Sequence, residues 1–185
     1  MRLRWLDLDI ENAPLTYLGS DFTTAEVTAI AAGFVGEGRI NCWLLTRDPL
    51  SRKKMLLGFR RMYDQADGVA GHYLLKHDLP ILNGAMIEAG LPPLGPKLTS
   101  DTKIHFVTSS GVSESQENLS QMYGLQEEKS HMSNASWREA NRLTPRGLAK
   151  TRARVVGDVR QHMALRAVMI RRGHLRRPQM WRPGA

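Results

Sequence analysis

The chain has 185 residues, of which 42% are hydrophobic, so it is long enough for one domain with its own core. Its single cysteine excludes an internal disulfide framework, and no stretch forms a signal peptide or approaches the roughly 18–20 apolar residues of a membrane span. The net charge of +8 is uneven, because residues 1–137 hold 13 Lys/Arg and 16 Asp/Glu, whereas residues 138–185 hold 13 Lys/Arg and two acids. We therefore expect a soluble, cytoplasmic protein with a polyanionic partner and no membrane contact.

The first predicted element is a strand over residues 3–14, LRWLDLDIENAP, which ends at Pro14. With period two, apolar residues share one face and acids share the other: Leu6, Leu8 and Ile10 against Asp7, Asp9 and Glu11. Acids are poor strand formers, and three on one face repel each other unless a cation lies among them or water covers the face. This segment therefore fits either a metal-binding strand or an exposed edge strand. Asp7 could flank the site, although an exposed charge is the simpler interpretation.

Further strands and helices follow the first strand. Strands are predicted over 25–36, 40–46, 67–74 and 102–107, and helices over 51–66 and 77–91. We expect Leu82, Met86 and Ile87 to be buried in the second helix. Asp101 precedes the last of these strands, where it could support a site from behind its ligands, although an ordinary turn acid is the simpler interpretation. The order of elements predicts an antiparallel meander that leads into an α/β arrangement.

Two further helices are predicted between residue 113 and residue 173, and the second lies in the arginine-rich segment 138–185. Ser113 and Gln116 have the spacing of a capping box for a short helix that Gly124 closes. Thr144 and Pro145 open a long helix that ends near Gly173, with two glycines at 147 and 157 that could divide it. Residues 174–185 are expected to form a loosely held basic tail. All basic residues from 138 onward except Lys150 are arginine, which suits phosphate but also a solvated basic helix.

Two more acids, Asp78 and Asp158, lie where they could bind a metal ion. Asp78 begins a helix, where an acid is favoured by the helix dipole and N-capping is the simple explanation. Asp158 has the apolar neighbours Val155, Val156 and Val159, and an acid beside a buried face needs a partner. A nearby arginine is the simple partner, and a metal ion is the alternative.

Three segments carry a family resemblance: LDIEN (8–12), GHYLLKHDLPIL (71–82) and RVVGDVRQH (154–162). Their order and spacing resemble the three exonuclease motifs of the DEDD (DnaQ-like) 3′–5′ exonucleases of the ribonuclease H-like superfamily, over residues 5–172. KSHMSNASWREA (129–140) is similar to phage-type members. The resemblance implies a ribonuclease H-like α/β fold, a mixed five-stranded sheet flanked by helices, over residues 1–173, followed by the basic tail 174–185.

The resemblance also implies a reaction. Two Mg²⁺ or Mn²⁺ ions would be held by four carboxylates: Asp9, Glu11, Asp78 and Asp158. Such a pair activates water and stabilises the leaving oxygen during phosphodiester hydrolysis. The implied activity is a metal-dependent 3′–5′ exonuclease acting on a single-stranded or frayed end of DNA or RNA, with a replication protein as the expected protein partner.

The sequence departs from the family at the proton acceptor. Members carry a Tyr four residues, or a His five residues, before the last Asp, and these positions hold Arg154 and Ala153. His162, one helical turn after Asp158, and His131 are the candidate replacements, although each fits a solvated histidine as well. Expected substrate contacts come from the middle motif and the basic third: His72, Tyr73, Lys76, Arg154, Arg171, Arg172, Arg176 and Arg177.

Two other functions remain open at the level of sequence. Without the usual acceptor, the chain could bind nucleic acid and cleave it weakly or not at all. It could also be a structure-specific endonuclease of the same fold. Metal-dependent release of mononucleotides, internal cuts, or binding without cleavage distinguish the three.

Overall fold

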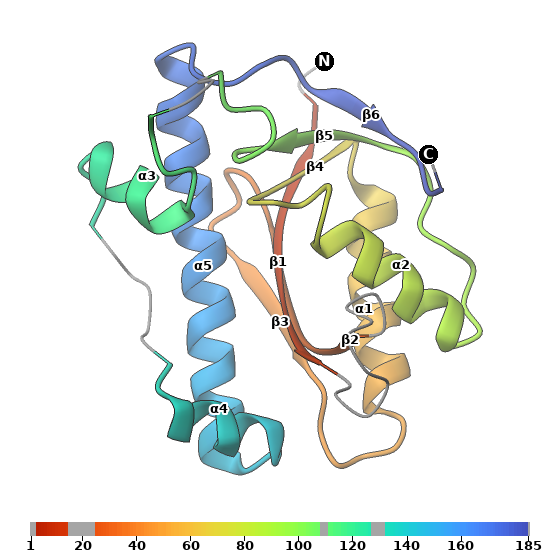
Figure 1. Ribbon diagram of the computed structural model, residues 1–185. Coiled ribbons are helices and arrows are strands. Elements are labelled where there is room, and N and C mark those ends of the chain that lie inside the picture. The colour runs from red at the N-terminus through yellow and green to blue at the C-terminus, as the bar shows by residue number, and fades with distance from the viewer. Residues whose placement is uncertain (1–2, 15–24, 108–110, 127–131, 185) are drawn as a thin grey trace.

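The computed structural model describes residues 3–14, 25–107, 111–126 and 132–184. A six-stranded mixed sheet forms the middle layer (Figure 1). Its order is β3-β2-β1-β4-β5-β6, with bounds Ile40–Leu44, Ala25–Phe34, Trp5–Pro14, Gly68–Gly71, Lys97–Asp101 and Gln179–Trp181. Strands β1, β4 and β5 run parallel, and β2, β3 and β6 are antiparallel to their neighbours. The predicted α/β class with a mixed sheet is confirmed, with one strand more than the expected five.

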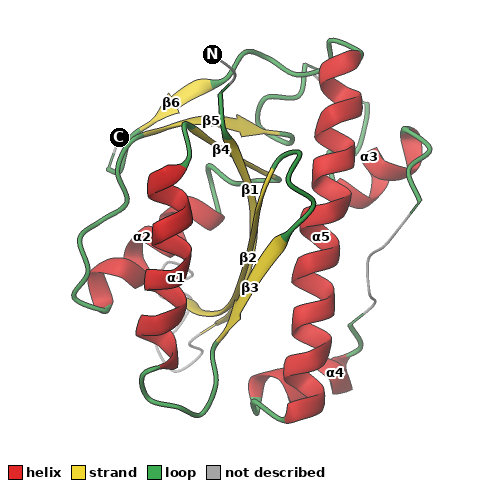
Figure 2. Ribbon diagram, turned by 180° about the vertical axis from the view of Figure 1, so that it is seen from behind, coloured by secondary structure: helices red, strands yellow, loops and turns green. Residues whose placement is uncertain are grey.

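Helices cover both faces of this sheet (Figures 1 and 2). The helices α1 (Ser51–Gln65) and α2 (Asp78–Glu88) lie on one face. The long helix α5 (Pro145–Arg171) crosses the other, beside α3 (Gln116–Met122) and α4 (Asn134–Asn141). Within the described ranges, no helix combines the length and apolarity needed to cross a membrane.

The main core lies between the sheet and α1 and α2. It contains the apolar face of β1 that the period-two pattern predicted: Leu6, Leu8 and Ile10. Under α5 the sheet instead presents small residues, Ala29 and Ala31, against Val155 and Val159. Small side chains let the helix approach the sheet closely, which brings the acidic face of β1 within reach of α5. Ile87, expected in the core, is 59% exposed, because it follows buried Met86 by about 100° around α2.

Two predicted strands have different bounds. Strand β4 stops at Gly71 rather than residue 74, and the chain then turns through Tyr73, whose φ is +63°. The fifth strand lies at 97–101, not 102–107. The Asp101 carboxylate accepts the N–H groups of Lys103 and Ile104, at 2.9 and 3.0 Å, which closes a turn where a strand was expected.

Three expectations for residues 113–185 were also wrong. Helix α5 runs unbroken through both glycines. At Gly147 a Cβ atom would lie 2.3 Å from the Glu139 carbonyl oxygen, so this glycine permits the close approach of α4. The N-cap of α3 is Ser115, which accepts from Asn118 N–H, rather than Ser113. The expected loose tail forms β6 and pairs with β5.

Candidate metal centre

Helix α5 lies over β1 so that their side chains match in spacing. A helix advances about 6.0 Å in four residues, and a strand advances about 6.6 Å in two. Every fourth residue of α5 can therefore face every second residue of β1. The facing residues are Arg154, Asp158 and His162 on α5, and Glu11, Asp9 and Asp7 on β1.

Each pair of facing residues forms one level of the contact between α5 and β1. The two outer levels each pair a basic residue with an acid. Arg154 Nε lies 2.7 Å from Glu11 Oε1, and His162 Nδ1 lies 2.7 Å from Asp7 Oδ1. Between them, Asp158 faces Asp9, so this level brings two carboxylates together. Oxygens of Asp9, Glu11 and Asp158 all lie within 4.8 Å of one another. We call these three residues the acidic cluster.

The crowding of carboxylates changes their protonation. Burial raises the pKa of Asp9 well above its ordinary value, and repulsion by Asp78 and Asp158 adds to this. Burial likewise raises the pKa of Asp78. The hydrogen bond to Asp78 raises the pKa of His77. At neutral pH the ionised cluster is therefore costly without a cation.

Asp78 lies beside the acidic cluster rather than within it. It is the first residue of α2, is 2% exposed, and its Oδ1 accepts the N–H of Ile10 at 3.2 Å. The N-cap position belongs to His77, so capping does not explain Asp78. Among neighbouring charges, Asp78 has the largest effect on Asp9. The helix start thus directs a fourth carboxylate toward the strand that carries the cluster.

Arg154 is a cationic group that contacts the acidic cluster. Its Nε also lies 3.7 Å from Asp158 Oδ2, and its guanidinium carbon lies 5.6 Å from the centre of the Trp137 ring. A guanidinium is never a proton acceptor in a protein. Arg154 therefore neutralises part of the cluster's charge but cannot act as a base.

The donor set of the cluster fits a hard divalent cation. All donors are carboxylate oxygens, which Mg²⁺ and Mn²⁺ prefer, and the described residues bring no cysteine or histidine into the acidic cluster. A cation here would balance the negative charges of Asp158 and Asp9, which face each other. The cluster could thus hold a metal ion.

Of the two histidines predicted as proton acceptors, the structure describes His162. His162 is 2% exposed, and Asp7 and Thr102 engage its two ring nitrogens. His131 falls outside the described residues. Asp7, expected as an exposed charge, is fully buried, because α5 covers this face of β1 and supplies His162 as its partner.

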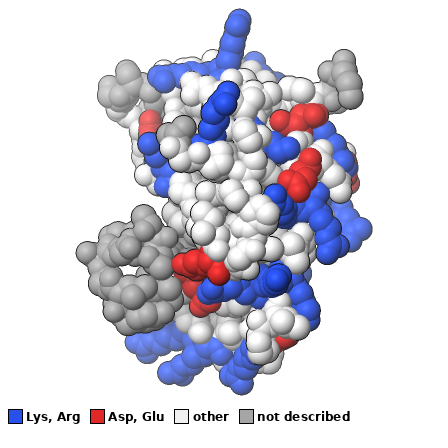
Figure 3. Space-filling model, turned by 90° about the vertical axis from the view of Figure 1, so that its right-hand side faces the viewer, with Lys and Arg blue, Asp and Glu red and all other residues white. Residues whose placement is uncertain are grey.

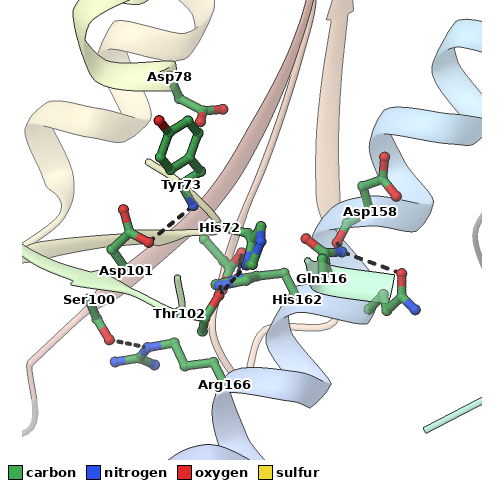
Figure 4. A network of polar contacts seen from close by, with 12 residues as sticks. His72, Tyr73, Asp78, Ser100, Asp101, Thr102, Gln116, Asp158, His162 and Arg166 are labelled. Atoms are coloured by element: carbon green, nitrogen blue, oxygen red, sulfur yellow. Dashed lines mark hydrogen bonds and ion pairs between the residues drawn. The ribbon is translucent and has the colours of Figure 1, made fainter. Parts of the chain in front are cut away.

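The predicted contacts of the middle motif lie in the turn between β4 and α2. Tyr73 and Lys76 are exposed and His72 is half-buried. The Asp101 carboxylate holds this turn by accepting the N–H groups of Tyr73 and Leu75, at 3.0 and 2.9 Å (Figure 4). The turn follows a strand adjacent to β1, so it borders the site.

The four remaining predicted arginines are exposed beyond the site: Arg171, Arg172, Arg176 and Arg177. Residue 171 is thirteen residues after Asp158, about 20 Å along the helix axis. These side chains do not join the acidic cluster. They could contact only a ligand that extends well away from it.

Three further residues support the site, of which the sequence indicated only Asp101 for such a role. Asp101 organises two turns, Thr102 bonds His162, and Gln116 on α3 donates from Nε2 to the Asp158 carbonyl at 3.1 Å (Figure 4). The Ser-Asp-Thr sequence before a turn was a usable signal for Asp101. No local signal marks the others, since their partners are distant in sequence.

No family model and no curated protein sequence matches this chain. Among solved structures, its fold is similar to that of the family B DNA polymerase from the hyperthermophilic archaeon Pyrobaculum calidifontis, with a TM-score of 0.68 and 17% identity. The similarity covers 92% of this chain and 25% of that polymerase chain. The shared architecture is compatible with the predicted ribonuclease H-like fold. At this identity it shows the fold alone.

Proposed function

We propose that this protein is a metal-dependent 3′–5′ exonuclease that hydrolyses phosphodiester bonds of nucleic acid. The observation that carries the proposal is that Asp158 faces Asp9, so that two acids lie between the Arg154–Glu11 and His162–Asp7 contacts. Acids that are buried together need a compensating cation or a bound proton, and a divalent cation compensates more than one carboxylate. The 3′–5′ polarity rests on the resemblance of the three motifs to the DEDD family.

Each residue near the site has a role in this reaction. Asp9, Glu11 and Asp158, with Asp78 beside them, would hold two Mg²⁺ or Mn²⁺ ions. Such ions lower the pKa of bound water and stabilise charge on the leaving oxygen. Arg154 lies at the rim of the same cluster, where its guanidinium can bond a phosphate oxygen.

The charge distribution supports a nucleic-acid substrate. The side of the molecule that carries α1 and α2 shows acidic and basic groups beside one another (Figure 3). The surplus of arginine instead belongs to the segment that forms α5 and β6. Phosphate contacts along that segment would be independent of sequence.

Binding without cleavage is the second candidate function. It is favoured by one observation, namely that Arg154 occupies the position of the usual Tyr and pairs with two of the cluster's acids. On this interpretation the arginine replaces the cation permanently. The protein would then keep the fold and the affinity for a polyanion, but not the chemistry.

Metal-dependent cleavage of an end-labelled strand tests the proposal. A single strand labelled at its 5′ end should shorten stepwise from its 3′ end when Mg²⁺ or Mn²⁺ is added, and mononucleotides should be released. DNA and RNA strands of the same sequence show which substrate is preferred. Asp158→Asn should bind the strand and leave it intact, because it removes one ligand charge and keeps the shape of the side chain.

The other outcomes separate the alternatives. Internal fragments without mononucleotides would identify an endonuclease. Strand binding with no cleavage at any metal concentration would favour the second candidate. Equal cleavage by the wild type and Asp158→Asn would show that the acidic cluster is not the site.

A further inference from the structure

A surface pocket lies where β1 begins and α5 ends, at one end of the molecule (Figure 1). The spacing that matches α5 to β1 continues beyond the acidic cluster, so Arg166 lies over Trp5. Arg166 follows Asp158 by eight residues, about 12 Å along the helix axis, so the pocket is separate from the acidic cluster. We call it the β1–α5 pocket. Its volume is about 340 Å³, and it is lined by Leu3, Trp5, Val35, Arg166 and Ile170.

Three aliphatic side chains form the rim of the β1–α5 pocket. Leu3 is 49% exposed, Val35 is 42% exposed and Ile170 is 51% exposed. Among the described residues, nine large hydrophobic side chains are exposed, and three of these nine meet at this one pocket. Exposed apolar residues that are scattered singly are ordinary, whereas a contiguous group is typical of an interaction site. The rim therefore indicates a surface that another molecule covers.

Arg166 brings a buried positive charge to the β1–α5 pocket. It is 8% exposed, and its Nε donates to Ser100 Oγ at 2.9 Å. Of the five N–H groups of a guanidinium, four then remain, and within the described residues no acceptor bonds them and no carboxylate oxygen lies within 4.0 Å of the side-chain nitrogens. Burial lowers the pKa of Arg166, and the more distant charge of Asp7 opposes this shift. A buried cation without a close counter-ion favours an anionic ligand.

The surroundings of Trp5 make nucleic acid a poor occupant of the β1–α5 pocket. The guanidinium carbon of Arg166 lies 4.5 Å from the centre of the Trp5 ring. Toward the sheet, a Cβ atom at Gly68 would lie 2.6 Å from the ring, so the ring rests on the backbone of β4. Both faces of the indole are therefore covered, and neither can stack on a base. A hydrated phosphate backbone would also gain nothing from an aliphatic rim.

The β1–α5 pocket fits a carboxylate that is joined to an apolar group. A guanidinium binds a carboxylate through two parallel N–H bonds, and the aliphatic rim binds the apolar part. The rim is about half exposed, so a small molecule inside the pocket would leave it in water, whereas a polypeptide that leads away from the pocket would cover it. The last residue of a protein carries its carboxylate and its side chain on one carbon atom. A chain end with an apolar last residue therefore meets both requirements in a single residue.

We propose that the β1–α5 pocket binds the C-terminal end of a partner protein whose last residue is apolar. The terminal carboxylate contacts Arg166, and the last side chain packs between Leu3, Val35 and Ile170. Because the pocket is two helical turns from Asp158, a partner that is bound there leaves the acidic cluster open. The interaction is separate from the proposed exonuclease function and holds whether or not the protein cleaves nucleic acid.

Two peptides that differ only at their last group test the proposal. One is Gly-Ser-Gly-Ile-Leu with a free terminal carboxylate, and the other is the same peptide ending in an amide. Titration of each peptide is followed through the indole N–H signal of Trp5 in ¹⁵N–¹H NMR spectra of the full chain. We expect saturable shifts with the free carboxylate at millimolar concentration or below. The amide should bind about tenfold more weakly, because it cannot form the charged pair with Arg166.

Variants of the rim and of the charge separate the two parts of the pocket. Ile170→Ser should weaken binding of the free-carboxylate peptide about fivefold, whereas the matched control Ile87→Ser, at an isoleucine that is 59% exposed on α2, should bind as the wild type does. Arg166→Gln should give the two peptides equal affinity, and Arg138→Gln, which removes an exposed charge from α4, should keep their difference. If Arg166→Gln does not fold, Ile170→Ser and the peptide pair decide the question, because the half-exposed Ile170 lies outside the core.

Three other ligands complete the test: octanoate, a single DNA strand, and the capped peptide acetyl-Gly-Ile-Glu-Leu-Gly-amide, which has only an internal acid. Tighter binding of any of them than of the free-carboxylate peptide would overturn the chain end as the occupant. Equal binding of the free-carboxylate and amide peptides, or no shift of Trp5 with either at millimolar concentration, would overturn the site itself. None of these measurements requires cleavage, so failure of the exonuclease function would leave their outcome unchanged.

Discussion

Replacing Asp9 by asparagine should make the metal-free protein more stable. Two unit charges 4.8 Å apart repel by about 3 kcal/mol at an effective dielectric constant of about 20. Arg154 offsets part of this repulsion through its ion pair with Glu11. We therefore expect Asp9→Asn to raise the free energy of unfolding by about 1–2 kcal/mol, which is about 2–8 °C in Tm for a chain of this size.

The same substitution should abolish stabilisation by metal. A ligand at one hundred times its Kd stabilises the folded state by about 2.7 kcal/mol, or about 5–10 °C here. The wild type should show such a shift on titration with Mg²⁺ or Mn²⁺, and Asp9→Asn should show little or none. Variant and wild type should thus exchange their order of stability as metal is added.

Thermal unfolding followed by fluorescence, with and without metal, measures both effects. The gain should also depend on pH. Because the folded-state pKa of Asp9 is raised above 3.8, its charge lowers stability as pH rises from 3.8 through the raised value. The advantage of Asp9→Asn should therefore be full near neutral pH and vanish as pH falls through that window.

The matched control is Asp64→Asn, which removes one negative charge from an exposed residue of α1. It should leave both the metal-free Tm and the metal-induced shift within about 1–2 °C of wild type. If Asp9→Asn destabilises the metal-free protein, or keeps the metal-induced shift, the assignment of Asp9 to a strained cation site is refuted.

Three further substitutions test other parts of the structure. Arg154→Met should tighten Mn²⁺ binding by about tenfold in calorimetry, because it removes a cation that competes for the same carboxylates. An unchanged affinity for Mn²⁺ would contradict that competition. Truncation after Gly173 should lower Tm, because it removes β6 and its pairing with β5. It should also flatten the salt dependence of single-strand binding by roughly one to three phosphate contacts. An unchanged slope would show that residues 174–185 do not contact the bound strand. Gly147→Ala should lower the free energy of unfolding by about 1–3 kcal/mol in chemical denaturation, although alanine favours helices. The reason is that the added Cβ would lie 2.3 Å from the Glu139 carbonyl oxygen. A stabilised variant would mean that α4 moves away freely.

The parts of the fold that the sequence predicted correctly are those with local signals. The alternation of apolar and acidic residues predicted β1 and its two faces, because side-chain period is a property of the strand itself. Thr144, Pro145 and Gly173 marked both ends of α5, because caps act within one helical turn. The shared strand face of Asp9 and Glu11 was predicted in the same way, whereas the grouping of Asp158 with them came from the resemblance of the three motifs.

The features that the sequence did not predict depend on partners far away in the chain. Asp7 is buried rather than exposed because His162, 155 residues later, covers and bonds it. Residues 179–181 form a strand only because β5 offers an unpaired edge. Their local sequence, QMW after a proline, carries no period that marks a strand. The position of β5 depended on an Asp101 turn, which a search for Asx turns would have found.

The matched spacing of α5 and β1 makes this protein intolerant of insertions in one particular place. One residue added between Arg154 and Asp158 would turn the rest of the helix by about 100°. Asp158 and His162 would then both turn away from the strand, so the acidic cluster and the contact between His162 and Asp7 would be lost in a single event. An added residue in the turn after Gly173 leaves the register of α5 unchanged. Length variation among natural relatives should therefore be excluded from residues 154–162 and permitted beyond the end of the helix.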